Sequence, residues 1–136
     1  MTLNIEEKKA IIEYRIQKAW KSFQEATDNA HLGHWTLAAS RLYYAAYYMA
    51  SALLVDRGII ARSHSGVIHI IGAEFVKKEL LPKEDGRLIS RLFNMRQSGD
   101  YDDLFDWTEE EVQPFFAQTE SFLKRIESLI TLNSNK

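Results

Sequence analysis

Apolar residues recur at steps of three and four along most of this chain, which is the spacing of helices with one buried face. The first such run covers residues 5–30, with Asn4 and Glu7 spaced as a capping box at its start and Gly33 placed to end it. A second run covers residues 35 to about 56. The connection between the two runs is so short that the helices should pack as antiparallel neighbours.

Shorter helices are expected after the turn marked by Gly58. Ser63 or Ser65 is placed to cap a third helix. Pro82 suits the first turn of a fourth helix, which should end before Gly99, where an aspartate-rich loop begins. The middle of the chain is therefore expected to add two short helices to the two long ones.

A second capping box, formed by Thr108 and Glu111, opens the last helix. Pro114 lies inside that helix, where it should delete one backbone hydrogen bond and bend the first turns. No alternation typical of strands, no internal repeat and no interdomain linker is visible. The chain therefore predicts a single all-α domain over residues 1–136, an antiparallel up-and-down bundle of four to five helices with its core at about residues 5–130.

The composition fits a globular protein and excludes several kinds of chemistry. Of the 136 residues, 46% are hydrophobic and 26% charged, and the formal net charge of -2 argues against bulk attraction to nucleic acid. The absence of cysteine removes disulfides, thiolate metal sites and cysteine nucleophiles. The N-terminal residues do not have the pattern of a secretory signal, and no apolar run approaches the roughly 18 residues that span a bilayer. We therefore expect a cytoplasmic protein without a membrane partner.

The most distinctive chemistry lies in the second expected helix, where the segment RLYYAAYY combines one arginine with four tyrosines. Arg41, Tyr44 and Tyr48 are spaced i, i+3 and i+7, so they share one helix face. Such a face can bridge helices, with each phenol finding one buried hydrogen-bond partner. It can equally bind a phosphate or carboxylate through the arginine while a tyrosine orients the anion. The sequence leaves both roles open.

Two further polar segments are candidates to complete this surface. His64 precedes a short helix whose first amides attract anions, although a capping loop with an exposed imidazole is the alternative. Arg96 and Asp100 are spaced to pair at the end of the fourth helix, with Tyr101 beside them. We expect these residues to meet the arginine–tyrosine face in a polar cluster within a cleft.

Neither a metal nor another cofactor is expected. His31 and His34 have only one nearby acid, and His69 lies on an apolar helix face, where a core or interface role is favoured. The acidic residues between positions 100 and 111 lack the glycine and terminal glutamate of a calcium-binding loop. Most of them suit the N-terminus of a helix, where negative charge is favourable.

Three segments, taken in order, resemble the HEPN family of small helical-bundle proteins. They are ASRLYYAAY at residues 39–47, SHSGV at residues 63–67 and RQSGDYD at residues 96–102. The resemblance is closest to the stand-alone bacterial and archaeal branch and covers roughly residues 5–130. It implies an antiparallel bundle that is frequently dimeric and is often encoded beside a nucleotidyltransferase-like partner in toxin–antitoxin pairs.

Many HEPN proteins are ribonucleases in which an arginine is followed, after four to six residues, by a histidine. The histidine is suited to accept the proton of a 2′-hydroxyl, and the arginine offsets charge on the phosphate. This chain departs from that pattern, because no histidine follows Arg96. The only formal match is Arg57 with His64, and Gly58 stands where a polar residue often follows the arginine. A nuclease would therefore use His64 as base and Arg57 as cation.

The function predicted first is a HEPN-like binding or interaction module that recognises a nucleotide or RNA phosphate together with a nucleotidyltransferase-type partner. A metal-independent endoribonuclease toxin and a structural protein–protein adaptor without a ligand are the alternatives. A homodimer is expected, because a bundle of long and short helices can leave an apolar stripe that a second copy covers. The residues expected to bind the ligand are Arg41, Tyr44, Tyr48, His64, Arg96, Asp100 and Tyr101.

Overall fold

The computed structural model describes residues 3–101 and 106–134, with the backbone alone for Tyr101 and residues 131–134. No strand occurs in these two ranges, so the expected all-α bundle is confirmed. A π-helical segment, Ile71–Val76, follows the third helix directly. The α-helices are α1 (Ile5–His31), α2 (Trp35–Asp56), α3 (His64–Ile70), α4 (Lys83–Tyr101), α5 (Glu109–Val112) and α6 (Pro114–Ser134).

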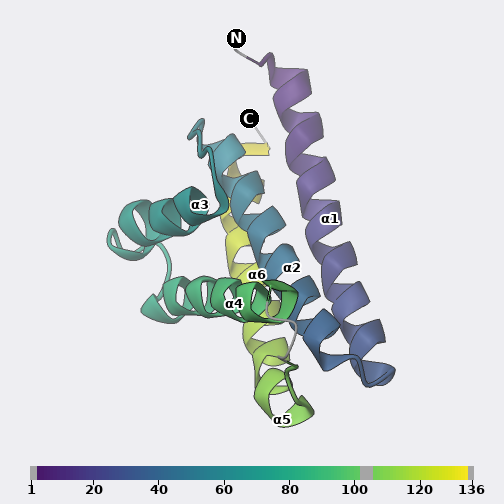
Figure 1. Cartoon of the computed structure of the whole chain (residues 1–136). Coiled ribbons are helices and arrows are strands. Elements are labelled where there is room, and N and C mark those ends of the chain that lie inside the picture. Colours follow the sequence, from purple (N-terminus) through teal and green to yellow (C-terminus); the bar gives the residue numbers. More distant parts are fainter. Residues whose placement is uncertain (1–2, 102–105, 135–136) are drawn as a thin grey trace.

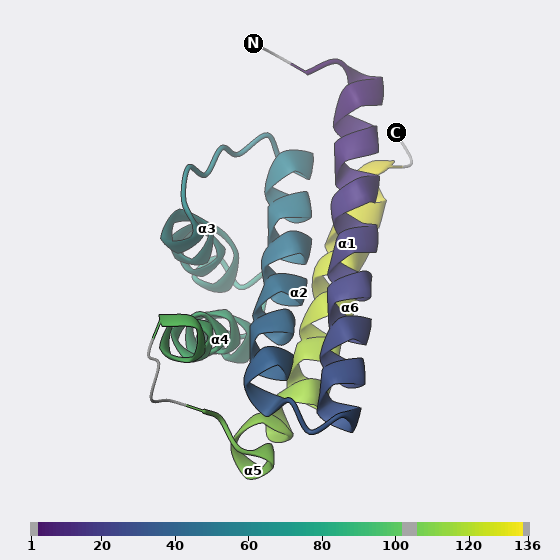
Figure 2. The same cartoon turned by 45° about the vertical axis from the view of Figure 1, so that its right-hand side comes forward.

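The central helix is α2. It runs antiparallel to α1 and parallel to α6, while α3 and α4 lie on its other side and α4 crosses it (Figure 1). The turned view in Figure 2 shows the same arrangement, with α5 near the turn that joins α1 to α2. Because small side chains let neighbouring helices approach closely, α2 can be enclosed in this way. Its alanines are at most 1% exposed: Ala38, Ala39, Ala45, Ala46, Ala50 and Ala52.

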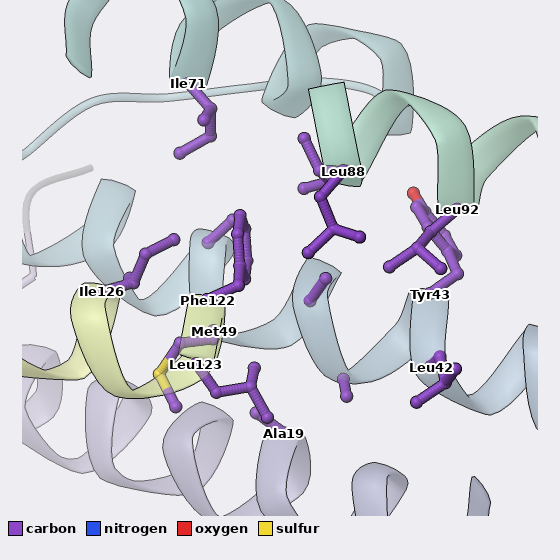
Figure 3. Close-up of a cluster of buried hydrophobic side chains, with 14 of the residues drawn as sticks. Ala19, Leu42, Tyr43, Met49, Ile71, Leu88, Leu92, Phe122, Leu123 and Ile126 are labelled. Carbon is purple, nitrogen blue, oxygen red and sulfur yellow. The ribbon is translucent and has the colours of Figure 1, made fainter. Parts of the chain in front are cut away.

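The core fills the space between α2 and the helices around it. Figure 3 shows side chains from α1, α2, α4 and α6 meeting there, with Tyr43 directed from α2 towards α4. Each large apolar side chain that is fully buried contributes about 1.5–3 kcal/mol of transfer free energy. Members that are less than 2% exposed include Leu42, Met49, Leu53, Ile71, Ile89, Leu92, Phe122, Leu123, Ile126 and Ile130.

Both expected capping boxes and the expected glycine after the first helix are confirmed. The Asn4 side chain accepts a hydrogen bond from the Glu7 amide at 2.8 Å, and Glu7 accepts one from the Asn4 amide at 3.1 Å. Thr108 and Glu111 form the same reciprocal box before α5. Gly33, after the end of α1, has a φ of +79°, a left-handed conformation that favours glycine. These ends are specified by residues only a few positions apart.

Pro114 starts a helix instead of bending one. The last helix was expected to run through it, but α5 ends at Val112 and α6 begins at Pro114. Proline has no N–H to donate and has a fixed φ near that of a helix. At the first helical position no backbone hydrogen bond is lost, because an N–H there has no partner within the helix. The expectation of one continuous helix is wrong for this reason.

Gly99 does not begin a loop, because α4 continues to Tyr101. A Cβ atom at Gly99 would lie 2.8 Å from Cγ2 of Thr36 and 3.6 Å from Cδ1 of Trp107. Glycine therefore lets α4 approach the start of α2 closely. The remainder of the expected loop, residues 102–105, lies outside the described residues.

Substituting Gly99→Ala should lower the free energy of unfolding by about 1–3 kcal/mol, because the new methyl group overpacks this contact. Thr36→Ser removes the obstructing Cγ2 but keeps the hydroxyl that accepts the Trp107 amide at 2.8 Å. The double variant should therefore recover much of the loss in urea unfolding followed by circular dichroism. Gly72→Ala is the matched control, since its Cβ would meet nothing within 4 Å. Equal stability of the Gly99→Ala and Gly72→Ala proteins would contradict this account.

Candidate functional site

Ser63 fixes the position of His64. The Ser63 hydroxyl caps α3 by accepting a hydrogen bond from the Gly66 amide at 3.0 Å, which decides between the two expected caps. A Cβ on Gly66 would come within 3.1 Å of that oxygen, so glycine leaves room for the cap. His64 is the first residue of α3. Ser63 therefore takes up one of the amides that were expected to attract an anion.

His64 packs against the tyrosines of α2. Its Nδ1 lies 2.6 Å from the hydroxyl oxygen of Tyr43. Its ring stacks on Tyr47, with centroids 4.2 Å apart and planes at 15°, and Tyr44 meets it edge-on at 6.3 Å. The imidazole is half-buried, so the alternative of an exposed capping histidine is wrong.

Two arginines approach the ring of Tyr44. Cζ of Arg41, from the same helix, lies 4.7 Å from the ring centroid, and Cζ of Arg96, from α4, lies 5.2 Å from it. Cζ of Arg96 also lies 6.0 Å from the centroid of the Tyr43 ring. A guanidinium within about 6 Å of a ring face is attracted by its quadrupole. The three polar segments picked out from the sequence, on α2, α3 and α4, therefore come together.

Each of the two guanidiniums has a carboxylate beside it. Nε of Arg96 donates to Oδ2 of Asp100 at 3.0 Å, the pair expected from their spacing. Nη1 of Arg41 lies 3.7 Å from Oε1 of Glu25 on α1. The Arg96 side chain is only 14% exposed, so its pair is less screened by water than a surface pair would be. The side chain of Tyr101, also expected at this site, lies outside the described residues.

The surroundings keep both members of the Tyr43–His64 pair uncharged. Burial, and then the neighbouring Tyr47, raise the pKa of Tyr43 above its ordinary value, and Arg96 offsets this only in part. Burial first and the charge of Arg96 second lower the pKa of His64. Near pH 7 the site therefore holds a neutral imidazole and a protonated phenol beside two guanidiniums.

The lowered pKa of His64 predicts a loss of stability in mild acid. As the pH falls below about 6.5, the unfolded chain takes up this proton before the folded chain does, so the free energy of unfolding decreases until the folded pKa is passed. The groups that face the imidazole are Tyr43, Tyr44 and Tyr47 from α2 and Arg96 from α4. In the His64→Gln protein, the free energy of unfolding measured with urea should not show this decrease. Identical pH profiles of the two proteins would count against it.

Arg57 is not part of this cluster. It lies at the end of α2, almost three turns beyond Tyr47 and about 15 Å further along the axis at the usual helical rise. Its guanidinium is 3.5 Å from Asp56 and 5.7 Å from the ring of Phe75. Among the described residues, Arg96 is the cation whose charge acts on His64. The structure thus places Arg96, and not Arg57, with the histidine.

Sequence reasoning missed Tyr43 and Tyr47, which make the short contacts with His64. Their i, i+4 spacing puts them on one helix face next to the face of Tyr44 and Tyr48. The ring centroid of Tyr48 lies 6.1 Å from that of Tyr44, so Tyr48 extends the row of rings. Nothing along the chain distinguishes which tyrosine pair meets α3, because that depends on how α3 is placed.

The cluster is a surface shared by α2, α3 and α4. A cavity of about 410 Å³ lies elsewhere, where Trp35, Glu109 and Phe116 are among the lining residues. Another, of about 330 Å³, lies between α4 and α6 beside Asp85 and Arg125. The cleft expected at the polar cluster therefore coincides with neither cavity.

Other expectations concern metals and membranes. Within residues 3–101 and 106–134, no group of three or more histidine, aspartate and glutamate side chains is arranged to hold a metal ion. His69 is exposed, so a core role for it is wrong, and the interface role that was the other expectation stays a prediction. None of the helices in the described part of the chain combines the length and apolar character that a bilayer crossing requires.

Comparison with known proteins places these residues in a family. The chain matches the family model of the HEPN domain over residues 12–129. It is 38% identical over 124 residues to a Thermotoga maritima protein named "UPF0332 protein", covering 91% of this chain and 94% of that one. It is 32% identical over 114 residues to the Methanocaldococcus jannaschii protein named "Putative toxin MJ0142", covering 84% of this chain and 78% of that one. The chain therefore belongs to the HEPN family, as its three motifs indicated.

Proposed function

We propose that this HEPN protein recognises the phosphate of a nucleotide or of RNA on the surface formed by Arg41, Tyr44, His64 and Arg96, called here the arginine–tyrosine surface. The observation that carries the proposal is the placement of two guanidiniums, 4.7 and 5.2 Å from one tyrosine ring, beside a half-buried neutral histidine. Guanidinium forks match phosphate oxygens in geometry and charge. The hydrogen bond to Asp100 helps to hold Arg96 in position before a ligand arrives.

The tyrosine rings favour a nucleotide over a simple anion. Tyr44, Tyr47 and Tyr48 are all half-buried, so each retains some exposed ring surface beside the arginines. Nucleobases stack on such rings, at about 1–3 kcal/mol per base. A phosphate held by the guanidiniums would bring an attached nucleoside close to this row. The proposed ligand is therefore a nucleotide, free or within single-stranded RNA.

We also propose that the protein acts as one half of a toxin–antitoxin-like pair, with a nucleotidyltransferase-type protein as its partner. Support comes from membership of the HEPN family and from two Methanocaldococcus jannaschii relatives named "Putative toxin MJ0142" and "Putative toxin MJ0605". A homodimer is part of the same proposal. The exposed apolar side chains of Leu3, just before α1, and of Ile5 and Tyr14 on the early part of α1 are candidates for its contact. Sedimentation that shows a monomer at micromolar concentration would remove the dimer.

A ribonuclease is the second candidate, because one observation favours it. The lowered pKa of His64 leaves the imidazole unprotonated at neutral pH, as a general base must be, and Arg96 is close enough for its charge to act on it. In that case Arg96, in place of Arg57, would offset charge on the phosphate during cleavage. The Arg57–His64 pairing has no contact to support it.

One experiment separates these functions. The purified full chain would be titrated in a calorimeter with inorganic phosphate, with ATP and with a short single-stranded oligoribonucleotide, and the RNA would be analysed on a gel afterwards. We expect ATP or the RNA to bind more tightly than phosphate and the RNA to stay intact. Cleavage that is lost in the His64→Ala protein would establish the nuclease instead. Absence of binding by all three probes would favour an adaptor without a ligand.

A further inference from the structure

Within the described part of the chain, the hydroxyl of Tyr43 has one hydrogen-bond partner. Tyr43 is 0% exposed. Its ring packs against the rings of Phe93 and Tyr47, with centroid distances of 5.5 and 5.9 Å. Buried hydroxyls are nearly always paired within the protein. Among the described residues, the partner of this hydroxyl is Nδ1 of His64, 2.6 Å away. The question is which of the two atoms carries the hydrogen.

The two arrangements are not equivalent. If Nδ1 carried the hydrogen and donated it to the phenol oxygen, the phenol hydrogen would be buried without an acceptor, which is the costly case for a polar group. If the phenol donates, its hydrogen and the Nδ1 lone pair satisfy one another. A neutral imidazole in that state carries its own hydrogen on Nε2.

We propose that Tyr43 is a positioning residue that donates its hydroxyl hydrogen to Nδ1 of His64 and thereby fixes the Nε2–H tautomer, so that His64 offers a hydrogen-bond donor to a phosphate oxygen. The stacked ring of Tyr47 restrains the imidazole plane. No hydrogen-bond partner of Nε2 occurs in the part of the chain that the structure describes, and His64 is only half-buried. The proposal rests on the proposed function, because it names the role of His64 at that site.

The electrostatics agree with this assignment. The raised pKa of Tyr43 keeps the phenol protonated as a donor, and the lowered pKa of His64 keeps Nδ1 available as an acceptor. The assignment also bears on catalysis. Nε2 that carries a hydrogen has no lone pair to accept another proton, so His64 in this tautomer binds a phosphate and does not act as a general base there.

Nitrogen-15 NMR of the histidine-labelled full chain tests the tautomer without any ligand. The His64 signals are assigned by their absence from the His64→Gln protein. We expect the correlation pattern of a neutral imidazole with hydrogen on Nε2. In the Tyr43→Phe protein the His64 pKa should rise, since the hydrogen bond that favours the neutral form is gone. Tyr47→Phe is the matched control, because it keeps the stacked ring and leaves the Tyr43 hydroxyl in place. A pattern with hydrogen on Nδ1 would overturn the proposal.

The donor role is tested by binding of ATP and of the short oligoribonucleotide. Glutamine at position 64 can accept from Tyr43 through its carbonyl and donate through its amide, whereas alanine can do neither. We expect His64→Ala to lose affinity by on the order of tenfold and His64→Gln to retain most of it. Equal losses in the two variants would refute a donor role for Nε2. If the wild-type protein binds neither probe, the proposed function fails, while the NMR experiment still decides whether Tyr43 is the donor.

Discussion

Replacing Arg96 by glutamine should weaken the binding of ATP or of a short oligoribonucleotide by on the order of tenfold to a hundredfold. The reason is that a hydrogen bond to a charged group contributes about 1.5–3 kcal/mol, and each 1.4 kcal/mol corresponds to a factor of ten in affinity. Arg96 is central to the arginine–tyrosine surface, since it reaches both Tyr43 and Tyr44 and acts on His64. Calorimetric titration at low and at physiological salt measures the change.

Two further variants make this result specific. Lys124→Gln removes one positive charge from the exposed surface of α6, where Lys124 pairs with Glu120 at 3.7 Å, and should leave affinity unchanged. Arg96→Lys keeps the charge but loses the planar fork, so its affinity should fall between those of the wild-type and Arg96→Gln proteins. Circular dichroism checks that each variant is folded. Similar affinities for the Arg96→Gln and Lys124→Gln proteins would show that the phosphate binds elsewhere.

Truncating Arg125 to alanine should lower the free energy of unfolding by about 2–3 kcal/mol. Asp85 on α4 is only 1% exposed and accepts two hydrogen bonds from Arg125 on α6, at 2.9 Å from Nε and 2.6 Å from Nη2. Removing the arginine leaves a buried carboxylate unpaired, a change that costs about 3–5 kcal/mol when both partners are buried. We expect a loss somewhat below that range because the Arg125 side chain is 42% exposed and water can reach the site.

The neighbouring lysine provides the control for this prediction. Lys124 and Glu120 form an exposed pair, for which truncation typically costs less than about 0.5 kcal/mol. Urea unfolding should therefore separate Arg125→Ala clearly from Lys124→Ala. Equal losses would mean that the Asp85–Arg125 pair contributes no more than a surface pair. The hydrogen bond to Asp85 is also the main cause of the raised pKa of Arg125.

The helices of this protein could be predicted from the sequence because the residues that start and end them are close together in the chain. The capping box at Asn4 and Glu7 acts across a single turn, and so does the one at Thr108 and Glu111. The error at Pro114 was also local, because proline suits the first position of α6. The error at Gly99 came from a residue whose role depends on a distant neighbour. Gly99 looked like a helix end along the chain, but its lack of a side chain serves a contact with Thr36, more than sixty positions away.

The residues of the candidate site could be predicted from the sequence only in part. The sequence indicated Arg41, Tyr44, His64 and Arg96, because they lie in the three segments that resemble the HEPN family and Arg41 and Tyr44 share a helix face. It also paired His64 with Arg57, which is near in the chain but contacts Asp56 and Phe75 in the fold. Sequence distance is a poor guide here, since the turn after α2 carries His64 back along that helix to Tyr43 and Tyr47.

By itself, the sequence determined that the chain forms helices, where most of them begin and end, and that it belongs among HEPN proteins. These properties follow from periodicity, caps and motifs that act within a few residues of one another. Only the tertiary structure decided that Tyr43 holds His64 and that Arg96 is the arginine beside it. Those contacts join α2, α3 and α4, and their partners are set by the crossing of α4 over α2, which depends on the packing of the whole core (Figure 1).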